Sequence, residues 1–299
     1  MMVLRFLRVL PLYLRGLAAA HYALRRGGPG LEFNRFGRQL GRRLVVKGMR
    51  SGLEYVLTPV NIVRYFEFPF ALSCLPEEPR QCLDVSSPRL FSFYVAKRKL
   101  SASILMLNPD RTDSSHTARM ASCLKYDNIR TQCTGVDAIE KHGKAYDCAW
   151  AISVIEHIAG AYDDRYAVKL MYDSLREGGR LVLTFPVDRR AWDEYRHSNE
   201  YGTQTPDSMG KYFFQRYYDK RAIEERVVSA IGTEPSIVRW FGEKSPGRFA
   251  AYERRWAREG IKCAVDDPRE IVDNYQEFST WEEMPGMGVC GMMIEKARG

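Results

Sequence analysis

Residues 83–90 read LDVSSPRL and lie where a short apolar run gives way to a helical pattern. The run QCLDV at 81–85 is suited to a buried strand, and PRLFSFYVAKRK at 88–99 has the spacing of a helix of about three turns. Ligand-binding α/β folds usually place a glycine-rich turn at such a junction, but this stretch contains no glycine. The function of this turn is therefore inferred from the segments around it.

Strand and helix patterns alternate from residue 81 onward. This regularity predicts an α/β fold with a mostly parallel sheet that is covered by helices on both faces. The predicted helices span 88–99, 114–124 and 163–176, where Gly178 and Gly179 follow as a stop. Further helices are predicted at 218–232 and around 250–258 and 269–278. The predicted strands span 81–85, 102–107, 128–135, 146–155, 180–186, 235–242 and 288–297.

Polar residues follow each of the first four predicted strands. Ligands bind beyond the carboxyl ends of the strands in an open parallel sheet, at the point where the strand order reverses. The candidate binding positions are therefore Asp84 to Pro88, Asn108 to Asp110, Asp137 with Ala138, and Ser153 to His157.

This series resembles the class I S-adenosylmethionine-dependent methyltransferases from about Gln81 to Pro186, and again at the last two strands. YDCAWAISVIEHI at 146–158 is similar to the family's fourth strand and following loop, and REGGRLVLTFP at 176–186 is similar to the start of its fifth strand. The resemblance implies a Rossmann-like methyltransferase fold: a seven-stranded, mostly parallel sheet with an antiparallel last strand, helices on both faces and a helical N-terminal extension. It also implies S-adenosyl-L-methionine as the cofactor.

The turn at residue 86 departs from the family pattern, a strand that ends D-apolar-G-x-G-x-G. Ser86, Pro88 and Leu90 align with those glycines. Ser87 is a good helix N-cap and proline is favoured at the first helical position, so a capped helix start would replace the glycines while Ser86 and Ser87 still meet the cofactor. The alternative is that Pro88 and Leu90 fill the pocket.

Polar residues near the first two strands match family positions that contact the cofactor. Asp84 matches the acid that faces the cofactor's amino group. Asn108, with Asp110 two residues later, stands where the family has an acid that accepts hydrogen bonds from both ribose hydroxyls. The alternative for the NPD segment is an ordinary Asx-Pro turn.

The loops after the third and fourth strands supply the remaining predicted contacts. Asp137 and Ala138 match the family's adenine contact, the alternative being a surface loop. Ser153 opens the loop in which Glu156 and His157 lie where methyl group and acceptor meet. A neutral imidazole there would accept a proton from an attacking hydroxyl, or the pair would only shape the pocket. No metal-ligand cluster is evident, so no metal site is predicted.

The predicted function is an S-adenosylmethionine-dependent methyltransferase that acts by direct in-line transfer. The segment 187–218 mixes aromatic, arginine and aspartate residues and, with 245–285, is the predicted acceptor-binding insertion or a solvated lid. A likeness to bacterial surface-glycan methyltransferases favours O-methylation of a small molecule, a sugar or a lipid-linked glycan. A nucleic-acid substrate is disfavoured because AISV replaces the family's base-methylating motif. The alternative function is an inactive methyltransferase-fold binding partner or scaffold.

The positive charge of the chain is concentrated at its N-terminus. Residues 1–50 hold eleven Lys and Arg and one acid, Glu32, whereas the rest is nearly neutral. Arg5, Arg8 and Arg15 interrupt the apolar run, which excludes a secretory signal and a membrane span. The pattern predicts a basic amphipathic helix, kinked or divided at Pro11, that lies on a membrane surface through residues 1–26 or packs on protein.

The predicted domains are a basic helical arm at 1–50, a helical lead-in at 51–80 and a methyltransferase-like domain at 81–299 with the two insertions. The seven cysteines include no CxxC pair, which indicates reduced core residues in a cytoplasmic protein. If the arm binds lipid, the protein would be peripheral on the inner membrane surface.

Overall fold

The computed structural model describes residues 2–200 and 205–298, and describes side chains from Val9 onward. The side chains of Arg5 and Arg8 therefore lie outside the described part, as does Tyr201 of the predicted acceptor segment. Chain contacts define two compact units, one of Met1–Pro69 with Phe241–Met287 and one of Phe70–Trp240 with Gly288–Gly299. The segment 245–285 thus groups with the N-terminal helices, while the borders predicted at residues 50 and 80 stay a prediction.

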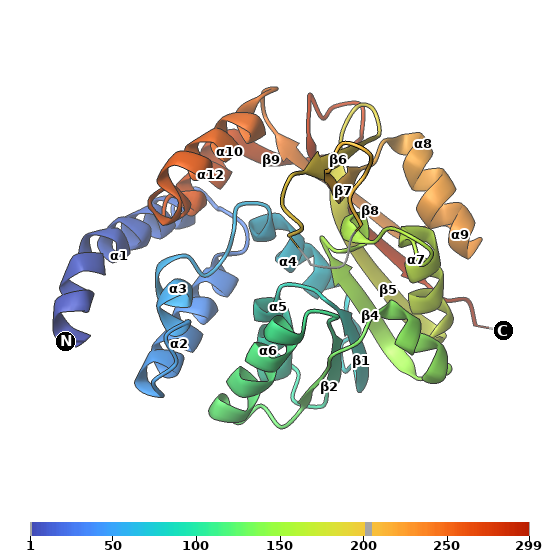
Figure 1. Ribbon diagram of the computed structural model, residues 1–299, viewed down its shortest axis with the longest axis horizontal. Helices are drawn as coiled ribbons and strands as arrows, with labels where there is room; N and C mark the ends of the chain where they lie inside the picture. The colour runs from blue at the N-terminus through green and yellow to red at the C-terminus, as the bar shows by residue number, and fades with distance from the viewer. Residues whose placement is uncertain (1, 201–204, 299) are drawn as a thin grey trace. The chain divides into compact units, whose positions relative to one another are not determined.

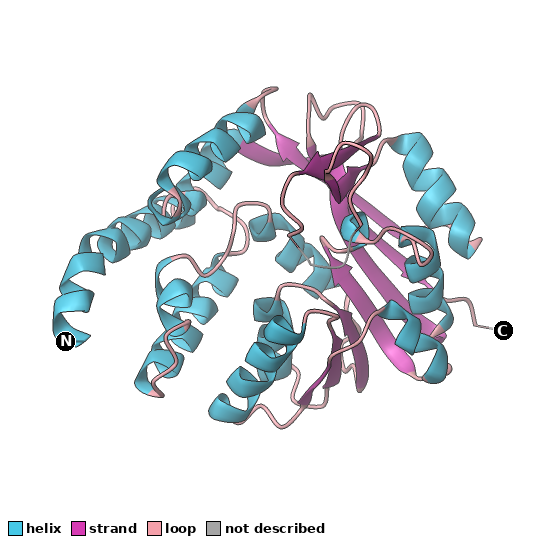
Figure 2. Cartoon of the chain, in the orientation of Figure 1, coloured by secondary structure: helices cyan, strands magenta, loops and turns pink. Residues whose placement is uncertain are grey.

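Eight strands of the described chain form one sheet in the order β3-β2-β1-β4-β5-β10-β8-β9 (Figure 1). The pairs β3–β2, β2–β1, β1–β4 and β4–β5 are parallel, and the pair β5–β10 is antiparallel. Helices lie on both faces (Figure 2). The strands are β1 Gln81–Val85, β2 Ser103–Leu107, β3 Ile129–Gln132, β4 Tyr146–Ile152, β5 Leu175–Val187, β8 Ile237–Glu243, β9 Tyr275–Phe278 and β10 Gly288–Glu295.

The predicted Rossmann-like fold with an antiparallel last strand is confirmed, with one strand more than expected. The additional strand, β9, spans Tyr275–Phe278, where the sequence pattern predicts the end of a helix. The strand order reverses direction between β1 and β4, so the carboxyl ends of these two strands border the switch point of the sheet.

Strand β4 forms the centre of the core because all seven of its residues are buried. Its Trp150 side chain is fully buried and meets the Phe91 ring edge-on at 5.5 Å. The one acid of the strand, Asp147, accepts hydrogen bonds from the backbone amides of Arg80 and Gln81, both at 2.7 Å, and pairs with Arg176. A buried carboxylate needs such partners, and these bonds align the start of β1 with β4.

The helices between the strands begin and end near their predicted positions. α5 spans Arg89–Arg98, α6 spans Arg111–Leu124 and α7 spans Asp164–Asp173. The prediction that the last of these runs to residue 176 is wrong. The carbonyl of Ser174 accepts hydrogen bonds from the amides of Ala145 and Tyr146, so the chain has already joined β4 at that point and the two glycines lie within β5.

The segment 187–218 contains a hairpin that the sequence pattern does not reveal. Strand β6, Trp192–Arg196, pairs antiparallel with β7, Tyr212–Tyr217, across a bulge at Glu194–Tyr195. The chain then forms α8, Lys220–Ile223, a π-helical turn over Glu224–Val228, and α9, Ser229–Ile231. A π-turn inside a helix often marks a functional position.

The other unit is mostly helical. Its helices in the N-terminal part are α1 Met2–Leu24, α2 Leu31–Val46, α3 Gly52–Leu57 and α4 Arg64–Cys74, whose last residues enter the sheet unit, and its C-terminal part holds α10 Arg248–Glu259, α11 Ile261–Ala264 and α12 Asp267–Asn274. α1 continues through Pro11, so of the two predicted alternatives, a kinked or a divided helix, the divided helix is wrong. Among the described residues, no helix is long and apolar enough to cross a bilayer.

Candidate functional site

The turn after β1 is built by a serine in a backbone conformation that favours glycine. Ser86 has φ 51°, in the left-handed region. Its amide and its hydroxyl both donate to the carbonyl of Leu107 at the end of β2, at 2.8 and 3.1 Å. A non-glycine residue in this region costs about 1–2 kcal/mol, which the two bonds offset. The position that aligns with the family's first glycine thus keeps the backbone conformation that glycine would provide.

A second serine is strained in the same way at the end of β4. Ser153 has φ 47°, and its amide donates to the carbonyl and hydroxyl oxygens of Thr184 at 2.9 and 3.1 Å. Three non-glycine residues of the described chain have positive φ, and the third, Lys125, ends helix α6. Backbone strain clusters at functional sites. Both strained serines border the switch point, which marks this edge of the sheet as the candidate site.

Ser87 links the turn to the neighbouring strand and does not cap the helix. Its hydroxyl accepts a hydrogen bond from the amide of Ile152 at 3.0 Å. The N-cap of α5 is Pro88, which makes no side-chain cap bond, and the helix begins at Arg89. The predicted Ser87 cap with Pro88 as the first helical residue is therefore wrong, because the buried amide of Ile152 uses the hydroxyl.

Asp84 points into the protein. It is fully buried, and its carboxylate accepts hydrogen bonds from the Ser87 amide at 2.9 Å and from the Ser92 hydroxyl. Burial raises the pKa of Asp84 to about 6, against the opposing effect of the hydrogen bonds from Ser92 and Ser87. The acid predicted to face the cofactor's amino group therefore serves in this structure to fix the turn.

Asn108 and Asp110 form a local turn, as in the Asx-Pro turn that was the alternative prediction for the NPD segment. Asn108 Oδ1 accepts from the amide of Asp110 at 2.9 Å, and its Nδ2 donates to Asp113 at 2.8 Å. Asp110 caps α6 by accepting from the amides of Thr112 and Asp113, at 2.7 and 3.1 Å. Both polar atoms of Asn108 are thus engaged within the chain, whereas Asp110 is exposed and uses its Oδ1 for the cap.

An ion pair that sequence reasoning missed lies across the ends of β1 and β2. Arg89, the first residue of α5, pairs with Asp113 in the first turn of α6. The Asp113 side chain is 39% exposed, so its carboxylate can accept further bonds from a ligand. The only sequence signal was an acid three residues after a helix cap, and that arrangement is too common to select Asp113.

Asp137 and Ala138 lie in a short 3₁₀ helix, Val136–Lys141, after β3. Asp137 is exposed and Ala138 is buried. A Cβ atom at Gly135 would lie only 2.7 Å from Asp137 Oδ1, so a larger residue at position 135 would displace this carboxylate. Asp137 thus offers an accessible acceptor at the same sheet edge.

Glu156 and His157 lie together in the 3₁₀ turn Ile155–His157 after β4. Glu156 is buried, and its Oε1 is 3.9 Å from His157 Nε2. His157 Nδ1 lies 2.7 Å from the carbonyl oxygen of Phe214 in β7. A carbonyl only accepts, so Nδ1 carries the proton, and Nε2 of the neutral ring is the nitrogen with a lone pair that can accept one. The predicted base therefore has the tautomer that a base requires.

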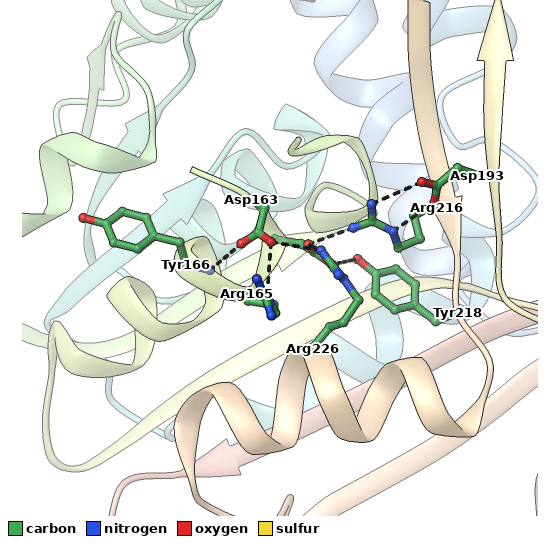
Figure 3. Close-up of polar contacts among 8 residues, drawn as sticks. Asp163, Arg165, Tyr166, Asp193, Arg216, Tyr218 and Arg226 are labelled. Atoms are coloured by element: carbon green, nitrogen blue, oxygen red, sulfur yellow. Dashed lines mark hydrogen bonds and ion pairs between the residues drawn. The ribbon is translucent and has the colours of Figure 1, made fainter. Parts of the chain in front are cut away.

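The hairpin is anchored by a buried aspartate, Asp164, near the same loop. Asp164 accepts hydrogen bonds from Arg216 at 2.8 Å and from Tyr218 at 2.6 Å, and Arg226 in the π-turn binds it through two nitrogens. Figure 3 shows the side chains of Arg216, Tyr218 and Arg226 directed toward one another. Arg216 also binds Asp193 in β6 at 2.9 Å. The network therefore joins α7, both hairpin strands and the π-turn.

The hydrogen-bonding and positively charged neighbours of Asp164 lower its pKa by more than burial raises it. Burial alone would raise its pKa, but hydrogen bonds from Arg226 and Tyr218 and the charges of Arg216 and Arg226 together lower that pKa. The network therefore holds its charge at neutral pH. Among residues 2–200 and 205–298, no group of three or more His, Cys, Asp or Glu is placed to hold a metal ion.

The strand order and the reversed strand β10 are those of the Rossmann-like fold of class I S-adenosylmethionine-dependent methyltransferases. The MccD protein has the same fold: its crystal structure is 10% identical, matches with a TM-score of 0.51 and covers 77% of this chain and 96% of its own. No protein-family model and no curated protein sequence matches the chain.

Two further solved structures are similar at lower scores. The [4+2]-cyclase SpnF is 17% identical over 78% of this chain and 80% of its own, with a TM-score of 0.49. The geranyl diphosphate C-methyltransferase from Streptomyces coelicolor A3(2), in complex with Mg²⁺, geranyl diphosphate and S-adenosyl-L-homocysteine, is 12% identical over 77% and 75%, with a TM-score of 0.48.

The buried Asp84 predicts a pH-dependent stability. Its folded pKa of about 6 exceeds the ordinary value of 3.8, so the folded state keeps this proton to higher pH than the unfolded chain. Its contribution to the free energy of unfolding therefore falls as pH rises from about 4 to about 6, by on the order of 3 kcal/mol. Urea unfolding of wild type and Asp84→Asn between these pH values measures it, and parallel curves would contradict it.

Replacing Asp164 by Asn should destabilise the protein and free the hairpin. The substitution leaves two partly buried arginines without their shared charge, which costs about 3 kcal/mol. The matched control is Asp193→Asn, which removes only the more exposed partner of Arg216 and should cost less than about 1 kcal/mol. Urea unfolding gives both values, and limited proteolysis should cleave residues 188–211 faster only in Asp164→Asn. Equal losses in the two variants would refute the anchor role.

Proposed function

We propose that this chain is an S-adenosylmethionine-dependent methyltransferase that methylates a hydroxyl group. The observation that carries the proposal is the turn at Ser86, whose φ of 51° preserves a glycine-type backbone at the switch point of a methyltransferase fold. A strained turn persists only where the surrounding structure maintains it. Fold alone does not imply function, so the strain at this edge is the stronger support.

The residues at this edge fit S-adenosylmethionine. The partly exposed turn at Ser86 would hold the amino-acid end, Asp113 would accept from the ribose hydroxyls, and Asp137 would accept from the adenine amine. Asp113 takes this role in place of Asn108, whose amide is engaged locally. When bound, the cofactor supplies an activated methyl group, so the chain has only to position the acceptor, exclude water and remove a proton.

His157 supports a hydroxyl acceptor. Its Nε2 is the proton-accepting nitrogen because Nδ1 donates to Phe214, and O-methylation requires that the acceptor hydroxyl loses its proton. The adjacent carboxylate of Glu156 would stabilise the imidazolium that results. The side chain of His157 is 20% exposed, so the imidazole is only partly covered by the protein.

The hairpin β6–β7 is the proposed acceptor-binding element. Trp192 and Tyr195 are 41% and 46% exposed, and the Trp192 ring stacks on Tyr217 at 4.2 Å with an interplanar angle of 6°. Flat, rigid aromatic faces beside polar groups suit a sugar or another hydroxylated acceptor. A small sugar or a lipid-linked glycan is therefore the acceptor class that we propose.

One observation favours the second candidate, an inactive methyltransferase-fold binding protein. Asp84 and Asn108, two of the polar residues predicted to meet the cofactor, use both of their side-chain polar atoms for hydrogen bonds within the chain, and Asp110 uses its Oδ1 to cap α6. An inactive protein would have no need of acceptors at this edge. Binding of the cofactor product separates the two candidates because it requires no knowledge of the acceptor.

Calorimetric titration with S-adenosylmethionine and S-adenosylhomocysteine should show binding of both. Ser86→Gly should retain the affinity, because glycine accepts the same φ, whereas Ser86→Val should lose it by distorting the turn. Lys125→Val is the matched control: it places a β-branched residue at φ 59°, away from the site, and should destabilise the chain without changing affinity. No heat from either ligand with wild type would favour the inactive candidate.

His157→Gln should lower the rate of methyl transfer by about 100-fold or more, because the proton acceptor is lost. The affinity for S-adenosylhomocysteine should stay within about twofold, since a base contributes to the transition state and not to cofactor binding. Transfer of a labelled methyl group to hydroxylated acceptors, with His116→Gln on α6 as the control, measures the effect. An unchanged rate would refute the role of His157.

A further inference from the structure

Between residues 14 and 24, helix α1 turns small residues inward and three leucines outward. Ala19 and Ala23 are buried, and a Cβ at Gly16 would lie 2.8 Å from the Arg38 guanidinium, so only small residues fit on this inner face. Leu14 and Leu24 are each 55% exposed, and Leu17 is 37% exposed. Packing alone would favour the opposite arrangement, because leucine gains far more than alanine from burial.

The inward face of α1 is fixed by specific bonds within its own unit. Arg15 donates to Asp266 at 2.9 Å, just before α12, and Tyr22 donates to Asp273 within α12 at 2.9 Å. These bonds lie on one side of α1, since positions 15 and 22 are seven residues apart. The helix is therefore held in one rotation, with the leucines directed away from the bonds.

The outward residues form a continuous stripe. Positions 14, 17, 18, 21 and 24 follow the three- and four-residue spacing of one helix face and extend over about 15 Å. Besides the leucines, the stripe contains the exposed residues Ala18 and His21. Contiguous exposed apolar surface of this kind usually marks an interaction site.

Positive charge adjoins the stripe on α1 itself. Arg25 and Arg26 are exposed and follow Leu24 directly, and Arg42 of α2, in the same unit, is exposed and donates to Tyr13 Oη of α1. Residues 1–50 contain one acid against eleven basic residues. A second copy of this chain would bring the same positive charge against the stripe, whereas an anionic surface complements both the leucines and the arginines.

We propose that the outward face of α1 binds the surface of an anionic lipid bilayer, with Leu14, Leu17 and Leu24 in the acyl boundary and the arginines at the headgroups. The helix lies in the interface and does not cross it, in keeping with the lack of a membrane-spanning helix among the described residues. This surface is independent of the methyl-transfer site, so it would bring the enzyme to lipid-linked or membrane-adjacent acceptors without taking part in the reaction.

Vesicle flotation of the full chain tests the proposal. The protein should float with phosphatidylcholine vesicles that contain phosphatidylglycerol and stay unbound with phosphatidylcholine alone. Replacing Leu14, Leu17 and Leu24 together by Ser should lower partitioning at least about 100-fold, because each leucine that enters the acyl boundary contributes about tenfold. Arg25→Glu with Arg26→Glu should lower it by at least about fivefold per arginine.

Two controls keep the outcomes distinct. Leu100→Ser removes an equally apolar side chain, 80% exposed in the other unit, and should leave partitioning unchanged. All replaced residues are exposed, so the thermal unfolding temperature of each variant should match that of wild type.

The proposal is overturned if the wild-type protein does not bind anionic vesicles, or if the triple-serine variant floats as well as wild type. A dimer in sedimentation velocity that the triple-serine variant abolishes also overturns it, because the stripe would then be a protein interface.

Discussion

The buried amide of Ile152 imposes the constraint on which the site depends. Strands β1 and β4 pair only as far as Asp84 and Trp150, so no residue of β1 faces this amide. The hydroxyl of Ser87 accepts its hydrogen bond at 3.0 Å. Leaving such a group unsatisfied would cost about 1–3 kcal/mol. Ser87 reaches Ile152 from a tight turn, and in that turn Ser86 takes up its left-handed conformation.

The other features of the site follow from this turn. The amide of Ser87 donates to Asp84 and, with Ser92, keeps that acid inside, so an acceptor for a ligand must come from another element. Asp113, held by Arg89 and Asn108, supplies an exposed carboxylate at the same edge. On the far side of the switch point, Phe214 orients His157, and the charged network of Asp164 holds the hairpin that carries Phe214. The residues at this edge of the sheet therefore act mainly by positioning ligands and side chains, and less as reactive groups.

Much of the fold was predictable because strand and helix periods are local properties of the sequence. The alternation after residue 81 and the buried run at 146–152 predicted the sheet, and the resemblance predicted the reversed last strand. Side-chain partners depend on distant segments: Ser87 binds β4, and Asp113 pairs with a residue of another helix. Nor does the helical wheel of α1 tell which face packs, because close contacts at Gly16 decide it. The β6–β7 hairpin was missed because its strands are short and mixed in polarity.

The central claim is that a serine turn maintains the cofactor site without glycine. A crystal structure of the full chain with S-adenosylhomocysteine tests it most directly. The claim predicts the ligand at the carboxyl ends of β1, β2 and β4, against the turn at Ser86 and the carboxylate of Asp113, with Ser86 still at positive φ. A structure in which this edge binds no ligand at saturating concentration, or in which the ligand occupies a different part of the chain, would contradict it.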